Sequence, residues 1–162
     1  MTELSHLDEA GAARMVDVSG KGATRREAVA TGVVRTTAEV IGLLSDGGLP
    51  KGDALATARI AGIMGAKRTS ELIPLCHQIA LSGVDVEFAL GKREVRITAT
   101  ARTTDRTGVE MEALTAVAVA GLTVHDMIKA VDPAATLDGV RLERKEGGKA
   151  GSWRRPEAGG RA

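Results

Sequence analysis

The sequence has almost no aromatic residues: one tryptophan, one phenylalanine and no tyrosine among 162 residues. A core must therefore be built from alanine, valine, leucine, isoleucine and methionine. Proteins that bind single-stranded nucleic acid use aromatic side chains on which successive bases stack. The composition argues against that class of protein and leaves the binding of a small ligand open.

Disulfides, an excess of charge and long apolar runs are also missing. A single cysteine allows no internal disulfide, which is typical of a reducing compartment. With 22 basic and 21 acidic residues, the formal net charge is +1, and a general polyanion binder would show a basic excess. The first residues, MTELSHLDEAGAA, lack the apolar run of a signal peptide, and no run of about 18 apolar residues predicts a membrane helix. We therefore expect a soluble cytoplasmic protein.

The length of the chain predicts one domain with its own core. We expect a mobile arm at residues 1–13, a single folded domain at 14–152 and a disordered tail at 153–162. The tail is rich in glycine and charged residues, which cannot bury enough apolar surface to become ordered.

The hydrophobic pattern predicts the order of the secondary structure. It favours a strand at 14–19, leaves 25–36 ambiguous, and then predicts a helix at 37–44, a helix from 53 to about 72, strands at 84–90 and 95–102, a long helix at 110–131 and a strand at 139–145. This order is typical of a split β-α-β arrangement. We therefore predict an α+β fold of the ferredoxin-like kind, an antiparallel sheet with helices packed on one face.

The only cysteine, Cys76, directly precedes His77. Neighbouring residues point to opposite faces of a strand and do not face each other in a helix, so the two cannot easily form a thiolate–imidazole pair. A structural zinc site usually needs four cysteine or histidine ligands, and the chain has one cysteine and three histidines without ligand spacing. We expect no metal site, with Cys76 as a small buried residue and His77 either facing an anion or exposed in a loop.

Two further clusters allow both a functional and a structural interpretation. The run Lys67-Arg68-Thr69-Ser70 suits phosphate oxygens, but it also suits a solvated helix face. Glu110 and Glu112 lie near a helix N-terminus, where acids are favoured by the helix dipole. Glu112 nevertheless lies on a helix made largely of alanine, valine and leucine. The helix dipole alone does not explain an acid on such an apolar helix.

Asp126 and Lys129 are three residues apart on the same helix face. They form either a surface ion pair of little worth or an acid–base pair in which each tunes the pKa of the other. Glu112 lies on a similar face but about 21 Å from Asp126 along the axis. One substrate could reach both only if it were long or if two subunits shared a pocket.

Nucleotide and dinucleotide motifs are absent. The run Lys145-Glu-Gly-Gly-Lys149 lacks the first glycine and the final hydroxyl residue of a phosphate-binding P-loop, and residues 20–25 lack the third glycine of a dinucleotide fingerprint. The clusters therefore indicate acid–base and phosphate chemistry performed by side chains alone.

Taken in order, these clusters resemble the cyclic pyranopterin monophosphate synthase family, the accessory C protein of molybdenum cofactor biosynthesis. The matching segments are MVDVSGKGATRREAVATG (15–32), KGDALATARIAGIMGAKRTSELIPLCH (51–77), TGVEMEALTAVAVAGLTVHDMIKAVD (107–132) and VRLERKEGGKAG (140–151). The chain departs from the family pattern at Gln78, His125, Ile128 and Ala150.

The resemblance implies an enzyme, a lyase without a resident cofactor, that converts a cyclised dihydro-GTP into a pterin with a cyclic phosphate and releases diphosphate. It also implies a hexamer built as a trimer of dimers, a site between subunits and a functional link to the pathway's radical enzyme, with Mg²⁺ on the triphosphate left open. By the same resemblance, the catalytic residues are Asp126, Lys129 and Lys145, and the substrate-binding residues are Lys51, Lys67, Leu75, Cys76, His77, Glu110, Met111 and Glu112. The alternatives are a non-catalytic module for a phosphate ligand or RNA, and a purely structural assembly subunit.

Overall fold

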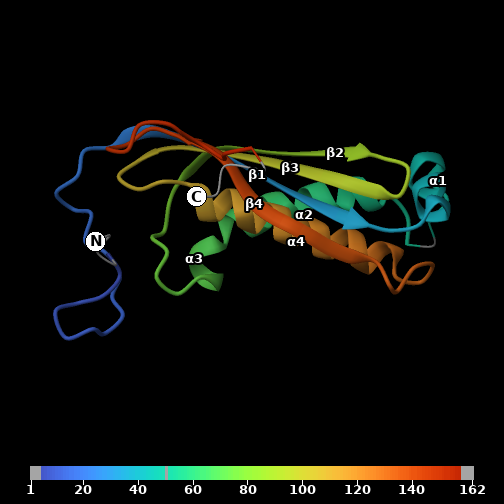
Figure 1. Cartoon of the computed structure of the whole chain (residues 1–162), viewed down its shortest axis with the longest axis horizontal. Coiled ribbons are helices and arrows are strands. Elements are labelled where there is room, and N and C mark those ends of the chain that lie inside the picture. Colours follow the sequence, from blue (N-terminus) through green and yellow to red (C-terminus); the bar gives the residue numbers. More distant parts are fainter. Residues whose placement is uncertain (1–4, 50, 158–162) are drawn as a thin grey trace.

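The chain forms a five-stranded antiparallel sheet with helices on one face (Figure 1). The computed structural model describes residues 5–49 and 51–157. In chain order the elements are β1 (Thr24–Arg35), α1 (Ala38–Asp46), α2 (Ala54–Lys67), α3 (Thr69–Leu72), β2 (Leu81–Leu90), β3 (Glu94–Asp105), α4 (Glu110–Ile128), β4 (Thr136–Glu146) and β5 (Trp153–Arg154). The strand order β2-β3-β1-β4-β5 places β1 between β3 and β4, as a split β-α-β arrangement requires. The predicted α+β fold is confirmed.

The core lies between the sheet and the two long helices. Alternate residues of β1, among them Ala28, Ala30 and Val34, are buried on the helix side, and Ile97 and Ala99 of the paired strand β3 are fully buried there too. Because many of these side chains are small, the helices approach the sheet closely.

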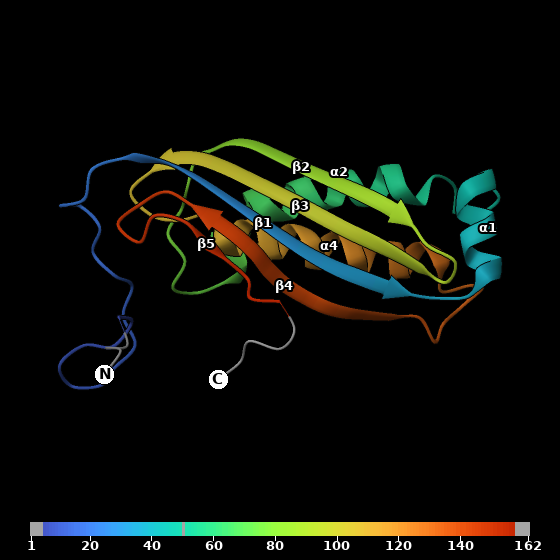
Figure 2. The same ribbon diagram turned by 45° about the horizontal axis from the view of Figure 1, so that its top comes forward.

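The helices α2 and α4 pack against each other and form the second layer (Figure 2). Gly62 of α2 lies against the carbonyl of Ala116 in α4, and Gly65 lies against Val119, so α2 lies close against α4 at these points. By length and composition, α4 is the one helix of the described residues that could cross a membrane; 56% of that stretch is buried inside the fold, as in the core helix of a soluble protein.

Local signals explain where the helices begin and end. The Thr37 hydroxyl accepts a hydrogen bond from the Val40 amide and caps α1, and the Asp53 carboxylate accepts one from Ala56 and caps α2. Gly47 ends α1 in the left-handed conformation, with φ of 68°, which glycine adopts without strain. A hydroxyl, a carboxylate and a glycine thus fix the limits of these helices.

The predicted strand at 14–19 is wrong. This segment is irregular, and the nearest bridge joins Leu7 to Ala13. The Asp17 carboxylate accepts a hydrogen bond from the Ser19 amide, which favours a turn. A strand also needs a pairing partner, and the next strand along the chain, β1, already pairs with β3 on one edge and β4 on the other. The ambiguous segment at 25–36 forms the first strand instead.

The predicted helix from 53 to about 72 is broken at Arg68, which separates α2 from α3. The buried Thr69 hydroxyl donates to the carbonyl of Ala66, a local bond that competes with regular helix geometry. The long helix ends at Ile128 rather than at 131, and the two hairpin strands and β4 extend a few residues beyond their predicted ends.

The two ends of the chain are only partly described. Trp153 and Arg154, which the sequence places in the tail, pair with β4 as β5, whereas residues 158–162 and 1–4 lie outside the described part. The predicted domain limits stay predictions.

Candidate functional site

A first cluster lies at the C-terminal end of α4. Asp126 accepts hydrogen bonds from Lys129 at 2.7 Å and from Lys51 at 2.8 Å, one on each carboxylate oxygen. Lys129 is the C-cap of the same helix, whereas Lys51 comes from the connection between α1 and α2. We call these three residues the Lys51–Asp126–Lys129 cluster.

The two lysines determine the charge state of Asp126. Hydrogen bonds from Lys129 and then from Lys51 lower the pKa of Asp126 to about 2, so the carboxylate is ionised at neutral pH. All three side chains are about half exposed. The cluster therefore presents two ammonium groups and one carboxylate to solvent, with a surplus of one positive charge that favours an anion.

A second cluster lies at the N-terminal end of α4. Lys145 of β4 donates to Glu110 at 2.9 Å, and both line a small cavity of about 50 Å³ with Arg26. One nitrogen of Arg26, Nε, is buried without a partner in the described chain. We call Glu110, Glu112 and Lys145 the Glu110–Lys145 cluster.

Glu112 is the buried acid of this cluster. Its side chain is only 3% exposed, and burial raises the pKa to about 7, opposed by a hydrogen bond to its own backbone and reinforced by the charge of Glu110. One carboxylate oxygen, Oε2, has no partner in the described chain. An acid with a pKa near neutrality can both donate and accept a proton at physiological pH.

The cysteine lies close enough to this cluster to be affected by its charge. Burial raises the pKa of the Cys76 thiol, and Glu112 and Glu110 raise it further, so the thiol stays protonated. Leu75 precedes it in the loop after α3, and Met111 lies between the two glutamates; both are half-buried. The raised pKa disfavours a nucleophilic thiolate at Cys76, and the side chain is half-buried rather than fully buried.

His77 contacts the N-terminal segment. Its Nε2 is 2.5 Å from the backbone carbonyl of Val16, which makes this nitrogen the donor. Asp17 follows Val16, and its pKa is lowered by hydrogen bonds from the Ser19 backbone and side chain, with a smaller contribution from His77. Nε2 of His77 is therefore engaged in a hydrogen bond within the chain.

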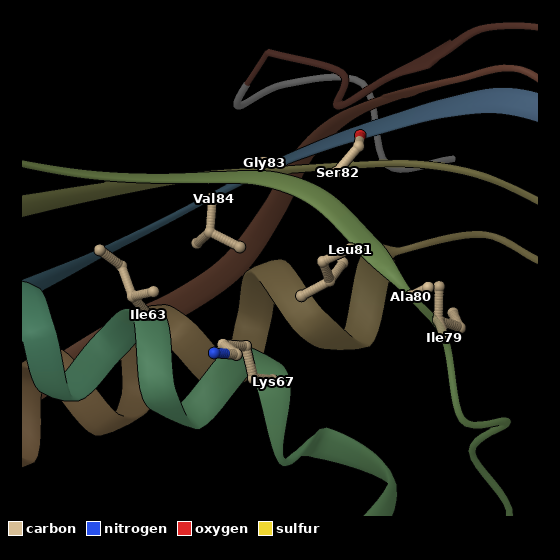
Figure 3. Close-up of a pocket in the computed structure, with 8 residues that line it drawn as sticks. All are labelled: Ile63, Lys67, Ile79, Ala80, Leu81, Ser82, Gly83 and Val84. Carbon is tan, nitrogen blue, oxygen red and sulfur yellow. The ribbon is translucent and has the colours of Figure 1, made fainter.

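Lys67 lies apart from both clusters. It lines a cavity of about 370 Å³ between the end of α2 and the start of β2, and Figure 3 shows its ammonium group among Ile63, Leu81 and Val84. The remaining lining residues are Ile79, Ala80, Ser82 and Gly83. The structure thus does not bring Lys67 into contact with the other predicted site residues.

The two clusters are far apart in one chain. Glu110 and Asp126 are 16 positions apart on one helix, which corresponds to about 24 Å along its axis. No group of three or more metal-ligating side chains gathers within residues 5–49 and 51–157. The C-terminal end of α4 therefore offers two lysines to a phosphate group. The N-terminal end offers Glu112, a buried acid with a pKa of about 7.

Sequence reasoning missed Arg26. The signal was present, because Arg26 has the same parity as Ala28 and Ala30 in β1 and therefore faces the helices. Gly147 and Gly148, in the run that lacks a P-loop motif, have a role in the fold itself. Both have positive φ, and a Cβ on either would collide with Arg25 or Arg26 of the same chain, so their lack of side chains already serves the fold.

Comparison with known proteins places the chain in a family. A model described as "MoaC family" matches residues 15–148. The chain is 67% identical over 153 residues to the "Cyclic pyranopterin monophosphate synthase 2" of Mycobacterium tuberculosis, covering 94% of this chain and 92% of that protein. It is 64% identical over 152 residues to the "Cyclic pyranopterin monophosphate synthase" of Streptomyces coelicolor, and 60% identical over 156 residues to that of a Nocardioides species, covering 94% of this chain and 89% and 96% of those proteins. The family that the sequence motifs suggested is confirmed, and this chain belongs to the MoaC family.

Proposed function

We propose that this chain is a cyclic pyranopterin monophosphate synthase. It converts (8S)-3′,8-cyclo-7,8-dihydroguanosine 5′-triphosphate to cyclic pyranopterin monophosphate and diphosphate, as a phosphorus–oxygen lyase of molybdenum cofactor biosynthesis. Relatives at 60–67% identity over most of the chain carry the name of this activity. The structural observation that carries the proposal is the Lys51–Asp126–Lys129 cluster, which offers two cations to a triphosphate beside a carboxylate.

The cations of the site bind the phosphates and stabilise the leaving group. Lys51 of one subunit, with His77 and Lys67 of a neighbouring subunit, holds the triphosphate and compensates the charge that develops on the departing diphosphate. This assignment requires the His77 ring to exchange its contact with Val16 for the substrate. Leu75, Cys76 and Met111 supply half-buried surface for the substrate. We propose no metal site on the protein.

Proton transfers during ring opening and closure fall to the ionisable groups of both clusters. Asp126, Lys129 and Lys145 carry this role, and the pKa of about 7 also suits Glu112 to it. A carboxylate with a pKa of about 2 is a weak base, so Asp126 in this state mainly orients the two lysines.

The active molecule is a cytoplasmic homo-oligomer, a hexamer built as a trimer of dimers. About 24 Å separates the clusters within one chain, whereas a site between subunits would join the Glu110–Lys145 cluster of one to the Lys51–Asp126–Lys129 cluster of another. Its substrate comes from the radical enzyme of the pathway, and neither nucleic acid nor a membrane takes part.

The direct test is turnover of the proposed substrate. The purified protein is incubated with the 3′,8-cyclo-7,8-dihydro-GTP substrate, and diphosphate and the oxidised fluorescent pterin are both measured. Lys129→Ala should reduce both by at least about a hundredfold, the scale of one acid–base group. Lys92→Ala, in the hairpin between β2 and β3, is the matched lysine control and should keep full activity.

A folded wild-type protein that binds the substrate and forms neither product would contradict the proposal. A non-catalytic ligand-binding module would then be the better description of this chain.

A further inference from the structure

The Lys51–Asp126–Lys129 cluster is assembled from two separate segments. Lys51 belongs to the connection between α1 and α2, and the other two residues belong to the end of α4. The three side chains are 44%, 53% and 53% exposed. Because packing of the side chains does not fix them, their separation depends on how firmly the two backbones are held together.

A buried hydrogen bond joins the residue that precedes the α1 cap to the turn that follows α4. The Thr36 hydroxyl donates to Oδ2 of Asp132 at 2.8 Å, and the two residues are 8% and 9% exposed. In the described parts of the chain, it is the only hydrogen bond between two side chains that are both buried. In a low-dielectric interior such a bond is strong, and leaving one partner unpaired is costly.

Each partner is in turn fixed to its own segment. The Thr36 amide donates to the carbonyl of Arg93 in the β2–β3 hairpin, and the next residue, Thr37, caps α1. The Asp132 amide donates to the carbonyl of Ile128, and Oδ1 of Asp132 accepts from the amide of Ala134. The bond therefore ties the start of α1 to the turn that leaves α4.

The link reaches Lys51 through α1 and a short anchored connection. Gly47 caps the helix, Leu49 is buried in the core, and the Gly52 amide donates to the Leu49 carbonyl. Lys51 lies between these anchors. A shift of α1 relative to α4 would therefore move Lys51 away from Asp126.

We propose that Thr36 and Asp132 are positioning residues whose hydrogen bond sets the separation of Lys51 from Asp126. Lys129 shares a helix with Asp126 and moves with it, so loosening the link removes Lys51 from the cluster and leaves the pair on α4 intact. The effect on substrate binding rests on the proposed function. The effect on the distance between Lys51 and Asp126 does not.

The experiment compares substitutions of one side chain. Thr36→Val removes the hydroxyl donor at similar volume, and Thr36→Ser retains it. Thr103→Val is the control for general destabilisation, because Thr103 is 1% exposed and its hydroxyl donates to the Ala80 carbonyl at 2.6 Å. Titration of the Asp126 carboxyl is followed by NMR, and KM and kcat are measured in parallel.

In Thr36→Val the carboxylate loses one of its two cations, so the pKa of Asp126 should rise from about 2 toward the ordinary value of an aspartate. KM should rise about tenfold, the effect of about 1.4 kcal/mol of lost binding, with a smaller change in kcat. Thr36→Ser and Thr103→Val should leave both the titration and KM at their wild-type values.

A folded Thr36→Val protein with unchanged titration and KM would overturn the inference, and so would an equal shift in Thr103→Val. If Thr36→Val does not fold, the same titration is made on Thr36→Val/Asp132→Asn, whose amide keeps the bond to Ala134 without an unpaired buried charge. The titration needs no substrate. A wild-type protein without turnover would therefore overturn the proposed function and leave this test in place.

Discussion

At Glu112, burial and the neighbouring charge of Glu110 favour the neutral acid. The pKa of about 7 exceeds the ordinary value of 4.5, so folding favours protonation. This contribution to the free energy of unfolding is fully present below about pH 4.5 and is lost as pH rises through 7; the shift corresponds to about 3 kcal/mol.

The prediction is that the protein becomes less stable between pH 5 and pH 8, and that Glu112→Gln reduces this loss. Denaturant unfolding at both pH values, with wild type and variant side by side, isolates the glutamate from other groups that titrate in this range. An equal loss of stability in wild type and Glu112→Gln would show that Glu112 is not the group responsible.

The sequence predicted individual residues best where the partners are neighbours on one helix. Asp126 and Lys129 pair as their spacing requires, and Glu110 and Glu112 begin α4. The contact of Lys51 with Asp126 joins residues 75 positions apart, and no local pattern encodes it. The hydrogen bond between Thr36 and Asp132 is equally long-range. The hydrophobic pattern places these residues only at the end of a strand and the end of a helix, and does not predict their contact.

Among the elements, the contact of α2 with α4 depends on glycines. A Cβ at Gly62 would lie 2.9 Å from the backbone oxygen of Ala116 and 3.2 Å from Ala120 and Val86. Backbone atoms cannot rotate away as the end of a side chain can, so the helices would have to separate. The glycine is therefore part of the packing and not only of the helix.

Gly62→Ala should lower the free energy of unfolding by about 1–3 kcal/mol, the cost of overpacking a core. Gly42→Ala in α1 is the matched control: nothing lies within 4 Å of its Cβ, so the higher helix propensity of alanine should stabilise the protein by up to about 1 kcal/mol. Denaturant unfolding at one protein concentration measures both changes. Equal effects of the two substitutions would contradict this account of the α2–α4 contact.

Helices and strands were predictable where the apolar residues followed one period, helical or alternating, over a long stretch. Examples are α4 and the hairpin of β2 and β3. β1 was ambiguous because its run AVATGVV is apolar on both faces, and both of its edges are paired in the sheet. The segment 14–19 has the residue types of a strand but pairs with no strand of the sheet. Strand formation depends on such a partner, which a short pattern does not reveal.

In the whole molecule, the ionisable clusters lie at the two ends of α4. Each end carries one of the two clusters proposed to form the site, and the clusters are about 24 Å apart. Large apolar side chains also lie exposed on the outer helices: Ile60 is 61% exposed, Met64 47% and Leu122 62%. Exposed apolar residues on two packed helices suit contact with another copy of the chain. The sequence predicted the separation along the helix, but no sequence pattern shows how copies meet.

The central claim, one catalytic site made from two subunits, is tested most directly by mixing two inactive variants. Glu112→Ala damages one end of α4 and Lys129→Ala the other, and the two are unfolded, mixed and reassembled together. The account predicts that each alone is inactive and that the mixture regains up to about a quarter of wild-type turnover, because random pairing leaves that share of shared sites intact. As a control, Asp126→Ala mixed with Lys129→Ala should stay inactive, since both changes damage the same end. A Glu112→Ala and Lys129→Ala mixture that forms mixed oligomers and remains inactive would contradict the shared site.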